Sequence, residues 1–275
     1  MIEGDLPQGA QRLAAAFARA RERGRAALIP YATGGFPTLE RSLELARRYA
    51  AAGADVVEFG IPFSDPLADG PTIQRAAAAA LATGTTPTDV LGIARRLADD
   101  LGPGGPPIVL LAYMNTVLAG DGGPERFLAD SAAAGVAGLV VPDLPVDEAS
   151  ATATAAAAHG IALVPFAAAT SSDARLAAMG EAARAGGFVY CVATAGVTGS
   201  RAALDESLPD FLTRARAHID APLAVGFGIS TPEQAAEVAS HADGVIIGSR
   251  LVELADDPSG AEEFLVRVAT AMAAR

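Results

Sequence analysis

The sequence predicts an α/β protein in which eight strand–helix units close into a (β/α)8 TIM barrel with an extra N-terminal helix. Eight short apolar runs recur along the 275 residues, and longer helical patterns separate them. Each run is apolar nearly throughout, as a strand buried on both faces of a parallel sheet should be. The length suits one barrel, for which about 250 residues is usual. We therefore expect a single domain over residues 1–275.

The first element is an amphipathic helix within residues 1–25, which we expect to cover the bottom of the barrel. The strands then follow in order. They are predicted at Ala26–Ala32, Asp55–Gly60, Ile108–Tyr113, Gly138–Pro142, Ile161–Phe166, Gly187–Ala193, Leu223–Gly226 and Gly244–Gly248. Eight strand–helix alternations in one chain favour a closed barrel over an open, doubly wound sheet.

Helices between the strands are marked by their starts and by alanine, the best helix former. Thr38 follows Pro37 and is a cap for the helix after it, and Thr231 stands directly before Pro232, at the first helical position. Four of the predicted helices are Thr38–Ala52, Pro145–His159, Pro232–Ser240 and Ala261–Ala274.

Charge excludes several classes of function. The formal net charge is −12, which repels nucleic acid and anionic membranes. No apolar run approaches the ~18–20 residues that span a bilayer, and the N-terminus lacks a signal pattern, so we expect a cytoplasmic protein. All 20 basic residues are arginine, so no lysine can form a Schiff base or serve a P-loop.

The residues that commonly bind metals are few and badly placed. Cys191 lies in an apolar run, where a buried, inert thiol is expected. His159, His218 and His241 each come just before an apolar run, which in a barrel is the face away from chemistry. We expect no metal site.

Chemistry in a barrel is carried by the loops after the strands. Glu58 interrupts the second strand near its upper end, where burial would raise its pKa and suit it to proton transfer. An ion pair with an arginine is the alternative. The loop Ile61–Gln74 adds Asp65 and Asp69. These aspartates either cap turns and the next helix, or form a two-carboxylate site with Glu58; Thr72 is a possible cap that would leave them free.

Other strand ends carry weaker signals. Asp143 follows the fourth strand and either caps the next helix or joins the site. The small-residue stretch Thr194–Ala202 has the composition of a mobile lid or of an ordinary loop. Gly226–Ser230 and Ile247–Arg250 end the last two strands before helices, the usual phosphate site of barrels.

Several of these segments resemble one family, the tryptophan synthase alpha subunits. VEFGIPFSDPLADGPTIQ, at 57–74, is similar to the family's signature, and VPDLP, AGVTGSR, GFGIS and GVIIGSRLV follow in the right order and spacing. The likeness runs from about Ala26 to about Leu254. GFGIS and IIGS are shared in kind with other phosphate-binding barrels, whereas the first motif is highly specific.

The resemblance implies a lyase of tryptophan biosynthesis that splits indole-3-glycerol phosphate into indole and glyceraldehyde 3-phosphate. It implies that Glu58 moves protons and that Asp69 holds the indole N–H. The chain itself would carry no cofactor. Asp65 would face a pyridoxal-phosphate-containing beta subunit in an α2β2 heterotetramer. The implied phosphate ligands are Gly199, Gly228, Gly248 and Ser249. The implied pocket residues are Tyr31, Leu111, Tyr113, Val140, Asp143, Tyr190, Thr198, Phe227 and Ile246.

The residues of this chain can carry out the implied C–C bond cleavage. Cleavage of a C–C bond without lysine or metal needs another electron sink, and indole protonated at C3 is one, so two carboxylates suffice. Two departures from the family stand out: Tyr31 replaces a common phenylalanine, and Asp121–Pro124 is rich in glycine.

Three alternatives stay open at this point. A stand-alone lyase that releases free indole would share every catalytic residue and would turn over fast without a partner. A regulatory, non-catalytic barrel would have lost Glu58 or Asp69. Another phosphate-binding barrel enzyme, such as an isomerase, gives no reason for the loop Ile61–Gln74.

Overall fold

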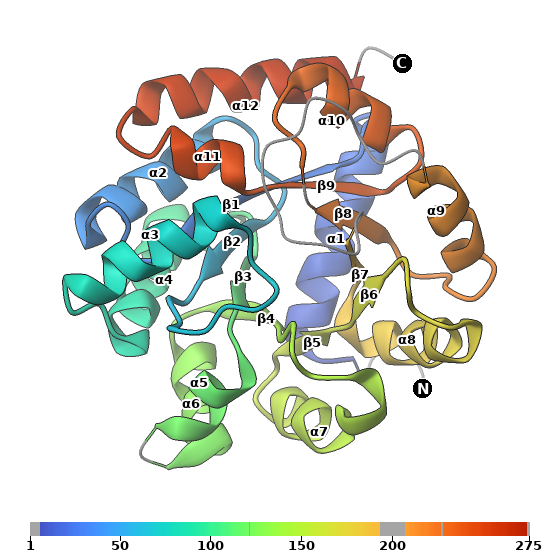
Figure 1. Cartoon of the computed structure of the whole chain (residues 1–275), viewed down its shortest axis with the longest axis horizontal. Coiled ribbons are helices and arrows are strands. Elements are labelled where there is room, and N and C mark those ends of the chain that lie inside the picture. The colour runs from blue at the N-terminus through green and yellow to red at the C-terminus, as the bar shows by residue number, and fades with distance from the viewer. Residues whose placement is uncertain (1–5, 121, 193–206, 227, 274–275) are drawn as a thin grey trace.

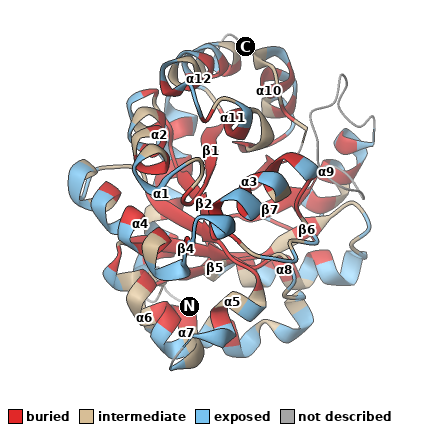
Figure 2. Cartoon of the chain, turned by 60° about the vertical axis from the view of Figure 1, so that its left-hand side comes forward, coloured by how far each residue is buried: buried red, intermediate tan, exposed pale blue. Residues whose placement is uncertain are grey.

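The computed structural model describes residues 6–120, 122–192, 207–226 and 228–273. Its strands form one parallel sheet in the order β5-β4-β3-β2-β1-β9-β8-β7-β6, rolled into a near-closed barrel that helices surround (Figure 1). The predicted (β/α)8 barrel is thereby confirmed. Burial follows the same plan, since the strands are buried and the helices turn exposed faces outward (Figure 2).

The strands lie close to the apolar runs of the sequence. Their bounds are Ala27–Thr33 (β1), Val57–Gly60 (β2), Ile108–Leu111 (β3), Val136–Val140 (β4), Ala162–Val164 (β5), Phe166–Ala168 (β6), Val189–Val192 (β7), Leu223–Gly226 (β8) and Gly244–Ile247 (β9). The prediction of a single fifth strand at Ile161–Phe166 was wrong, because Pro165 divides it. A proline has no N–H to donate to a strand ladder, and here β5 pairs with β4 while β6 pairs with β7.

Helices connect the strands and cover the outside of the barrel. They are Gln8–Glu22 (α1), Leu39–Ala51 (α2), Pro71–Ala82 (α3), Pro87–Leu101 (α4), Met114–Ala119 (α5), Gly123–Ala133 (α6), Ser150–Ala158 (α7), Asp173–Gly186 (α8), Leu208–Arg216 (α9), Pro232–Ala239 (α10), Ser249–Glu253 (α11) and Pro258–Ala273 (α12). A 3-10 turn, η2 (Val146–Glu148), precedes α7, so the predicted helix Pro145–His159 begins later than expected. None of the described helices is long and apolar enough to cross a membrane.

Two predicted helix caps are confirmed and one is wrong. The side chain of Thr38 accepts a hydrogen bond from the N–H of Arg41, and Thr231 forms a reciprocal capping box with Gln234. Thr72, by contrast, lies within the first turn of α3, whose cap residue is Gly70. Pro71 takes the first helical position, which shifts the helix start one residue ahead of Thr72.

Helix α1 packs against the end of the barrel at which the strands begin. Its apolar face, which includes Leu13 and Phe17, belongs to the same buried cluster as the side chains inside the barrel. The backbone N–H of Gly9 donates to the carbonyl of Gly160, just before β5. In Figure 1 α1 crosses behind the ring of strands. With this end filled, the mouth at the carboxyl ends of the strands is left for chemistry.

Candidate active site

A cavity opens at the carboxyl ends of the strands. Residues from six segments line it, namely Tyr31, Asp69, Ile73, Leu111, Tyr190, Gly228, Ile229, Ile246, Gly248 and Ser249. Eight of these ten were expected at the site from the sequence. Ile73 and Ile229 were missed as site residues, although both stand inside the segments IPFSDPLADGPTIQ and GFGIS that pointed to the site.

Two glycines make room for the aromatic walls of this cavity. A Cβ atom on Gly60 would lie 1.9 Å from Tyr31 Oη, and one on Gly226 would lie 2.7 Å from Tyr190 Oη. Because no side chain fits at either strand end, both rings can lie across the barrel mouth. Tyr31 Oη also pairs with the hydroxyl of Thr33 at 3.3 Å.

Glu58 lies on β2 opposite Tyr31 on β1 and is 1% exposed. Neither of its carboxylate oxygens has a hydrogen-bond partner within the part of the chain that the structure describes. Burial, followed by the negative charge of Asp69, raises the pKa of Glu58 to about 8. The arginine pair that the sequence left open is absent among these residues. A buried, unpartnered carboxyl group is costly to a fold, so its presence indicates function.

Asp69 is 7% exposed and is held from several sides. Tyr113 Oη donates to Asp69 Oδ2 over 3.2 Å, and the side-chain amide of Gln74 donates to the Asp69 carbonyl over 2.9 Å. Burial raises the pKa of Asp69 to about 6, and the bond from Tyr113 opposes that rise. Burial thus favours the protonated form of Glu58 more strongly than that of Asp69, which suits Glu58 to donate a proton and Asp69 to carry a negative charge.

Tyr113 also ties the loop of 61–74 to the barrel, a predicted loop whose last four residues, from Pro71 on, in fact form the first turn of α3. Its hydroxyl accepts a hydrogen bond from the N–H of Ala68 over 2.9 Å, and its ring stacks on Phe63 with centroids 5.0 Å apart. Asp65 lies farther out on the same loop and is exposed, with the Ser64 hydroxyl 2.5 Å from it. The sequence suggested that both aspartates of the loop could share one site, and the structure separates them.

Two other predicted residues, Val140 and Asp143, are not part of the cavity wall. Val140 is fully buried inside the barrel. Asp143 is exposed and accepts a hydrogen bond from the N–H of Met114 over 2.8 Å, so it caps the start of α5 and not the helix after Pro145. Thr198, Gly199 and Phe227, together with the predicted lid Thr194–Ala202, lie outside the described residues.

The end of the cavity beside β8 and β9 suits an anion. Gly228 has φ +79°, a conformation that favours glycine. Ser249 is the first residue of α11, so its N–H has no acceptor within the helix. Gly248 packs near Ile73 and Tyr31, and a Cβ there would come within 3.3 Å of Ile73. Glycine at 248 thus keeps this end open.

Candidate metal ligands do not gather in the described ranges, where no group of three or more His, Cys, Asp or Glu could hold an ion. Cys191 is buried in β7, as predicted, and burial raises the pKa of its thiol to about 12. His159 follows α7 and lies 3.0 Å from Glu125, and His218 follows α9 and lies 3.9 Å from Asp173.

Comparison with known proteins gives a consistent answer. The family model described as tryptophan synthase alpha chain matches residues 17–274. The chain belongs to the tryptophan synthase alpha chain family. It is 43% identical over 246 residues to the tryptophan synthase alpha chain of Carboxydothermus hydrogenoformans, covering 90% of each chain. It is 48% identical over 244 residues to that of Gloeobacter violaceus, covering 88% of this chain and 86% of the relative.

Solved structures agree with this membership of the tryptophan synthase alpha chain family. A chain of Mycobacterium tuberculosis tryptophan synthase superposes with a TM-score of 0.88 at 37% identity, with 96% of this chain and 99% of that chain covered. A tryptophan synthase alpha chain from Legionella pneumophila superposes with a TM-score of 0.83 at 32% identity, covering 95% and 97%.

Proposed function

We propose that this chain catalyses the alpha reaction of tryptophan synthase, the retro-aldol cleavage of indole-3-glycerol phosphate to indole and glyceraldehyde 3-phosphate. Membership of the family supports the reaction. The observation that carries the assignment of residues is Glu58, which is buried without a hydrogen-bond partner among the described residues, and whose pKa is raised to about 8 by burial and by the charge of Asp69. Proton transfer by a positioned carboxyl group is the catalysis that this cleavage needs.

Glu58 acts twice in the proposed mechanism. The protonated carboxyl group first donates its proton to C3 of the indole, which leaves a cationic, iminium-like ring. The resulting carboxylate then accepts the proton of the hydroxyl on the adjacent glycerol carbon. The C–C bond breaks, its electron pair returns to the ring, and the former hydroxyl oxygen becomes the aldehyde. Glu58 ends protonated again, so one residue completes the cycle.

Asp69 would stabilise the charge that this sequence creates. An ionised carboxylate that accepts the indole N–H is attracted more strongly to the cationic intermediate than to neutral indole, and such selective stabilisation accelerates a reaction. The bond from Tyr113 favours the ionised form of Asp69 and holds its oxygen in place. Tyr113 therefore serves the mechanism by positioning Asp69.

The walls of the cavity would divide the substrate between them. We assign the indole to the end formed by Tyr31, Leu111, Tyr190 and Ile246 together with Asp69, since this end is mainly aromatic and aliphatic. We assign the phosphate to Gly228, Gly248 and Ser249, with Gly199 as a further ligand. A chain of net charge −12 with no lysine attracts no phosphate at long range, so backbone N–H groups must bind it locally.

A beta subunit would bind over the same mouth. Leu67 in the loop of 61–74 is 86% exposed, and Leu118 on α5 is 51% exposed. Large apolar side chains left in water at the rim of a site favour a protein partner. Asp65, one turn away, would contact that partner too. We propose an α2β2 assembly in which pyridoxal phosphate belongs to the beta subunit.

An assay of indole release tests both the reaction and the partner. The isolated chain is incubated with indole-3-glycerol phosphate, with and without the beta subunit of the same organism. We expect slow release by the chain alone and faster release in the complex. Fast turnover alone, unchanged by the beta subunit, would instead identify a stand-alone lyase. No release under either condition, with substrate bound, would refute the catalytic assignment.

A further inference from the structure

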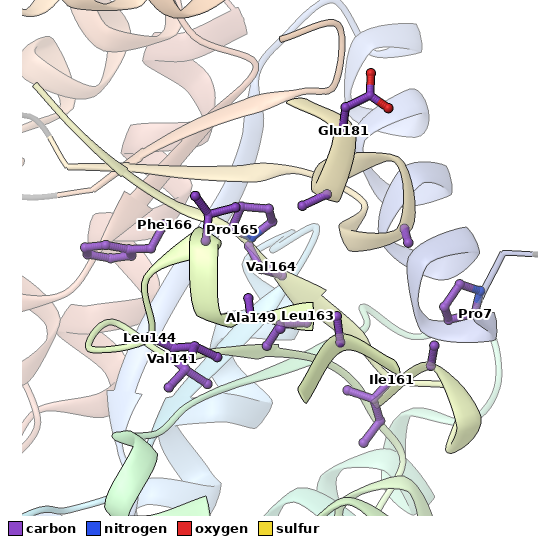
Figure 3. Close-up of a pocket in the computed structure, with 15 residues that line it drawn as sticks. Pro7, Val141, Leu144, Ala149, Ile161, Leu163, Val164, Pro165, Phe166 and Glu181 are labelled. Carbon is purple, nitrogen blue, oxygen red and sulfur yellow. The ribbon is translucent and has the colours of Figure 1, made fainter. Parts of the chain in front are cut away.

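A second cavity lies outside the barrel wall, between η2–α7 and α8, and the mechanism above does not use it. Figure 3 shows it extending from Pro7 and Ile161 at one end to Phe166 at the other. Its volume is about 150 Å³. That is below the roughly 300–1,000 Å³ of pockets for drug-sized ligands, but an apolar cavity of about this size can hold a benzene ring.

Small side chains create this space. The lining residues from α7, from the position just before it and from α8 are mostly alanine, at Ala149, Ala153, Ala157, Ala182 and Ala185. Two helices that pack through larger residues would fill such a gap, whereas alanine on both sides leaves a groove. The floor is aliphatic, with side chains such as Ile161 and Val164.

The lining carries little charge. Among the described residues, Glu181 is the one charged side chain that lines the cavity; it is 71% exposed and already pairs with Arg184 at 3.2 Å. Figure 3 shows the Glu181 carboxylate directed away from the other lining residues. No arginine in the described part of the chain lines the cavity, so it offers no positive side chain to a phosphate. An apolar, uncharged molecule is the ligand chemistry that fits.

The position of the cavity connects it with the catalytic site. β5 and β6 are the two edges of the sheet, so the barrel wall has its seam at Pro165, which lines the cavity. Val164 and Phe166, on either side of Pro165, line the cavity and also contact the cluster inside the barrel. The ring of Phe166 packs on Tyr190 with centroids 5.1 Å apart, and Tyr190 lines the catalytic cavity.

We propose that the α7–α8 cavity is a second binding site for indole-sized, uncharged aromatic molecules, the class to which the product belongs. The inference rests on the proposed function, because that function makes indole beside the same wall. The substrate itself fits less well, since none of the described lining residues is an arginine that could pair with its phosphate. A molecule bound in this cavity affects the catalytic site through the contact between Phe166, which lines the α7–α8 cavity, and Tyr190, which lines the catalytic cavity.

The test uses 5-fluoroindole as the probe and fluorine NMR as the readout. The catalytic cavity is first saturated with indole-3-propanol phosphate, which lacks the hydroxyl group needed for cleavage. We expect the probe still to bind. Crystals of the same complex soaked with 5-bromoindole should show an anomalous bromine peak between α7 and α8.

Adjacent alanines on α7 supply a matched pair of variants. Ala157 and Ala158 are both exposed, but only Ala157 lines the cavity. Ala157→Leu fills part of the space and should weaken the residual binding by about tenfold or more. Ala158→Leu adds the same side chain to the same helix and should leave the binding unchanged. Leucine is a good helix former, so both variants should fold.

The outcomes separate this inference from the proposed function. If the chain releases indole but the analogue abolishes all binding of the probe, or if both variants bind it equally, the inference is wrong and the function stands. Binding of an aliphatic probe such as 1-octanol without binding of 5-fluoroindole would also overturn it. If the chain releases no indole, the proposed function is refuted, and so is the argument that the ligand of the α7–α8 cavity belongs to the class of the product.

Discussion

Tyr113 Oη donates a hydrogen bond to Asp69 Oδ2 over 3.2 Å while it accepts one from the backbone N–H of Ala68 over 2.9 Å. One phenol thus fixes both the loop of 61–74 and the carboxylate that this loop brings to the site. Tyr113 lies two residues after the end of β3, and Asp69 lies 44 residues before Tyr113 in the chain. The contact joins two successive strand–loop units of the barrel.

Tyr113→Phe should therefore lower turnover by about 10- to 100-fold, since a hydrogen bond to a charged group contributes roughly 1.5–3 kcal/mol. The pKa of Asp69 should rise as well, because the bond that lowers it is lost. Steady-state kinetics across pH measures both effects. Tyr49→Phe is the control: Tyr49 is another buried phenol, its hydroxyl has no partner among the described residues, and its removal should leave kinetics unchanged.

The dependence of kcat/KM on pH should be bell-shaped. Activity requires Asp69 ionised and Glu58 protonated, so it should rise as pH passes about 6 and fall as it passes about 8. Because each group acts on the other, the two limbs report the pair as a whole. A profile that stays flat from pH 5 to 9 would contradict the proposed protonation states. In Asp69→Asn the acid limb should disappear from the residual activity.

Glu58→Gln should reduce indole release by roughly 10²- to 10⁴-fold, the usual loss when a general acid–base group is removed. The change keeps the shape of the side chain but leaves nothing to donate to C3 or to accept from the hydroxyl. Retention of half the activity would exclude Glu58 as the proton carrier. Substrate affinity, measured by calorimetry, should change little.

The same variant should be more stable than the parent at alkaline pH. The pKa of Glu58 is raised from 4.5 in the unfolded chain to about 8 in the fold. The fold therefore binds the proton more tightly, and this contribution to stability is full below pH 4.5 and is lost as pH rises to about 8. Glutamine does not ionise, so the variant loses none of this stability as pH rises. Denaturant unfolding at pH 5 and pH 9 should show an advantage of a few kcal/mol that is confined to pH 9.

Much of this site could be predicted from local sequence, and part of it could not. Glu58 stood out because a single acid interrupts an apolar strand, and the run Leu223–Gly226 became β8 without change. Pro165 was visible in the sequence, but a run of apolar residues does not reveal that its two halves pair with different neighbours. Thr72 failed as a cap because Pro71 already starts the helix.

Contacts between distant segments were beyond such reasoning. Asp143 was placed at the rim correctly, yet its partner is the first N–H of α5, which only the folded chain brings near. The bond between Tyr113 and Asp69 is of the same kind. The roles of Gly228, Gly248 and Ser249 were inferred from family resemblance and loop position together, since glycines before a helix are common without any ligand.

Asp69→Asn should lower kcat far more than it raises KM. An amide can still accept the indole N–H, so neutral substrate should bind nearly as before, but it cannot balance the cation formed at C3. A rise in KM alone would make Asp69 a binding residue. Asp65→Asn, an exposed aspartate in the same loop, is the matched control and should leave the isolated chain's kinetics unchanged.

Ser249→Asp should weaken the binding of both substrate and glycerol phosphate, because it puts a negative charge where the phosphate is proposed to bind. Two variants of one residue separate charge from the loss of a hydroxyl group. Ser249→Ala removes the hydroxyl but keeps the backbone N–H at the start of α11, which is the donor that matters for an anion there. It should lose at most about tenfold in affinity, as for one neutral hydrogen bond. Ser249→Asp should lose much more affinity than Ser249→Ala. The difference in affinity between the two variants should shrink at high salt, which screens the repulsion between the new carboxylate and the phosphate.

Isothermal titration calorimetry with glycerol phosphate at low and high salt measures these differences without any contribution from the indole end of the cavity. Equal affinity of the parent and the aspartate variant would mean that the phosphate binds at another end of the barrel mouth.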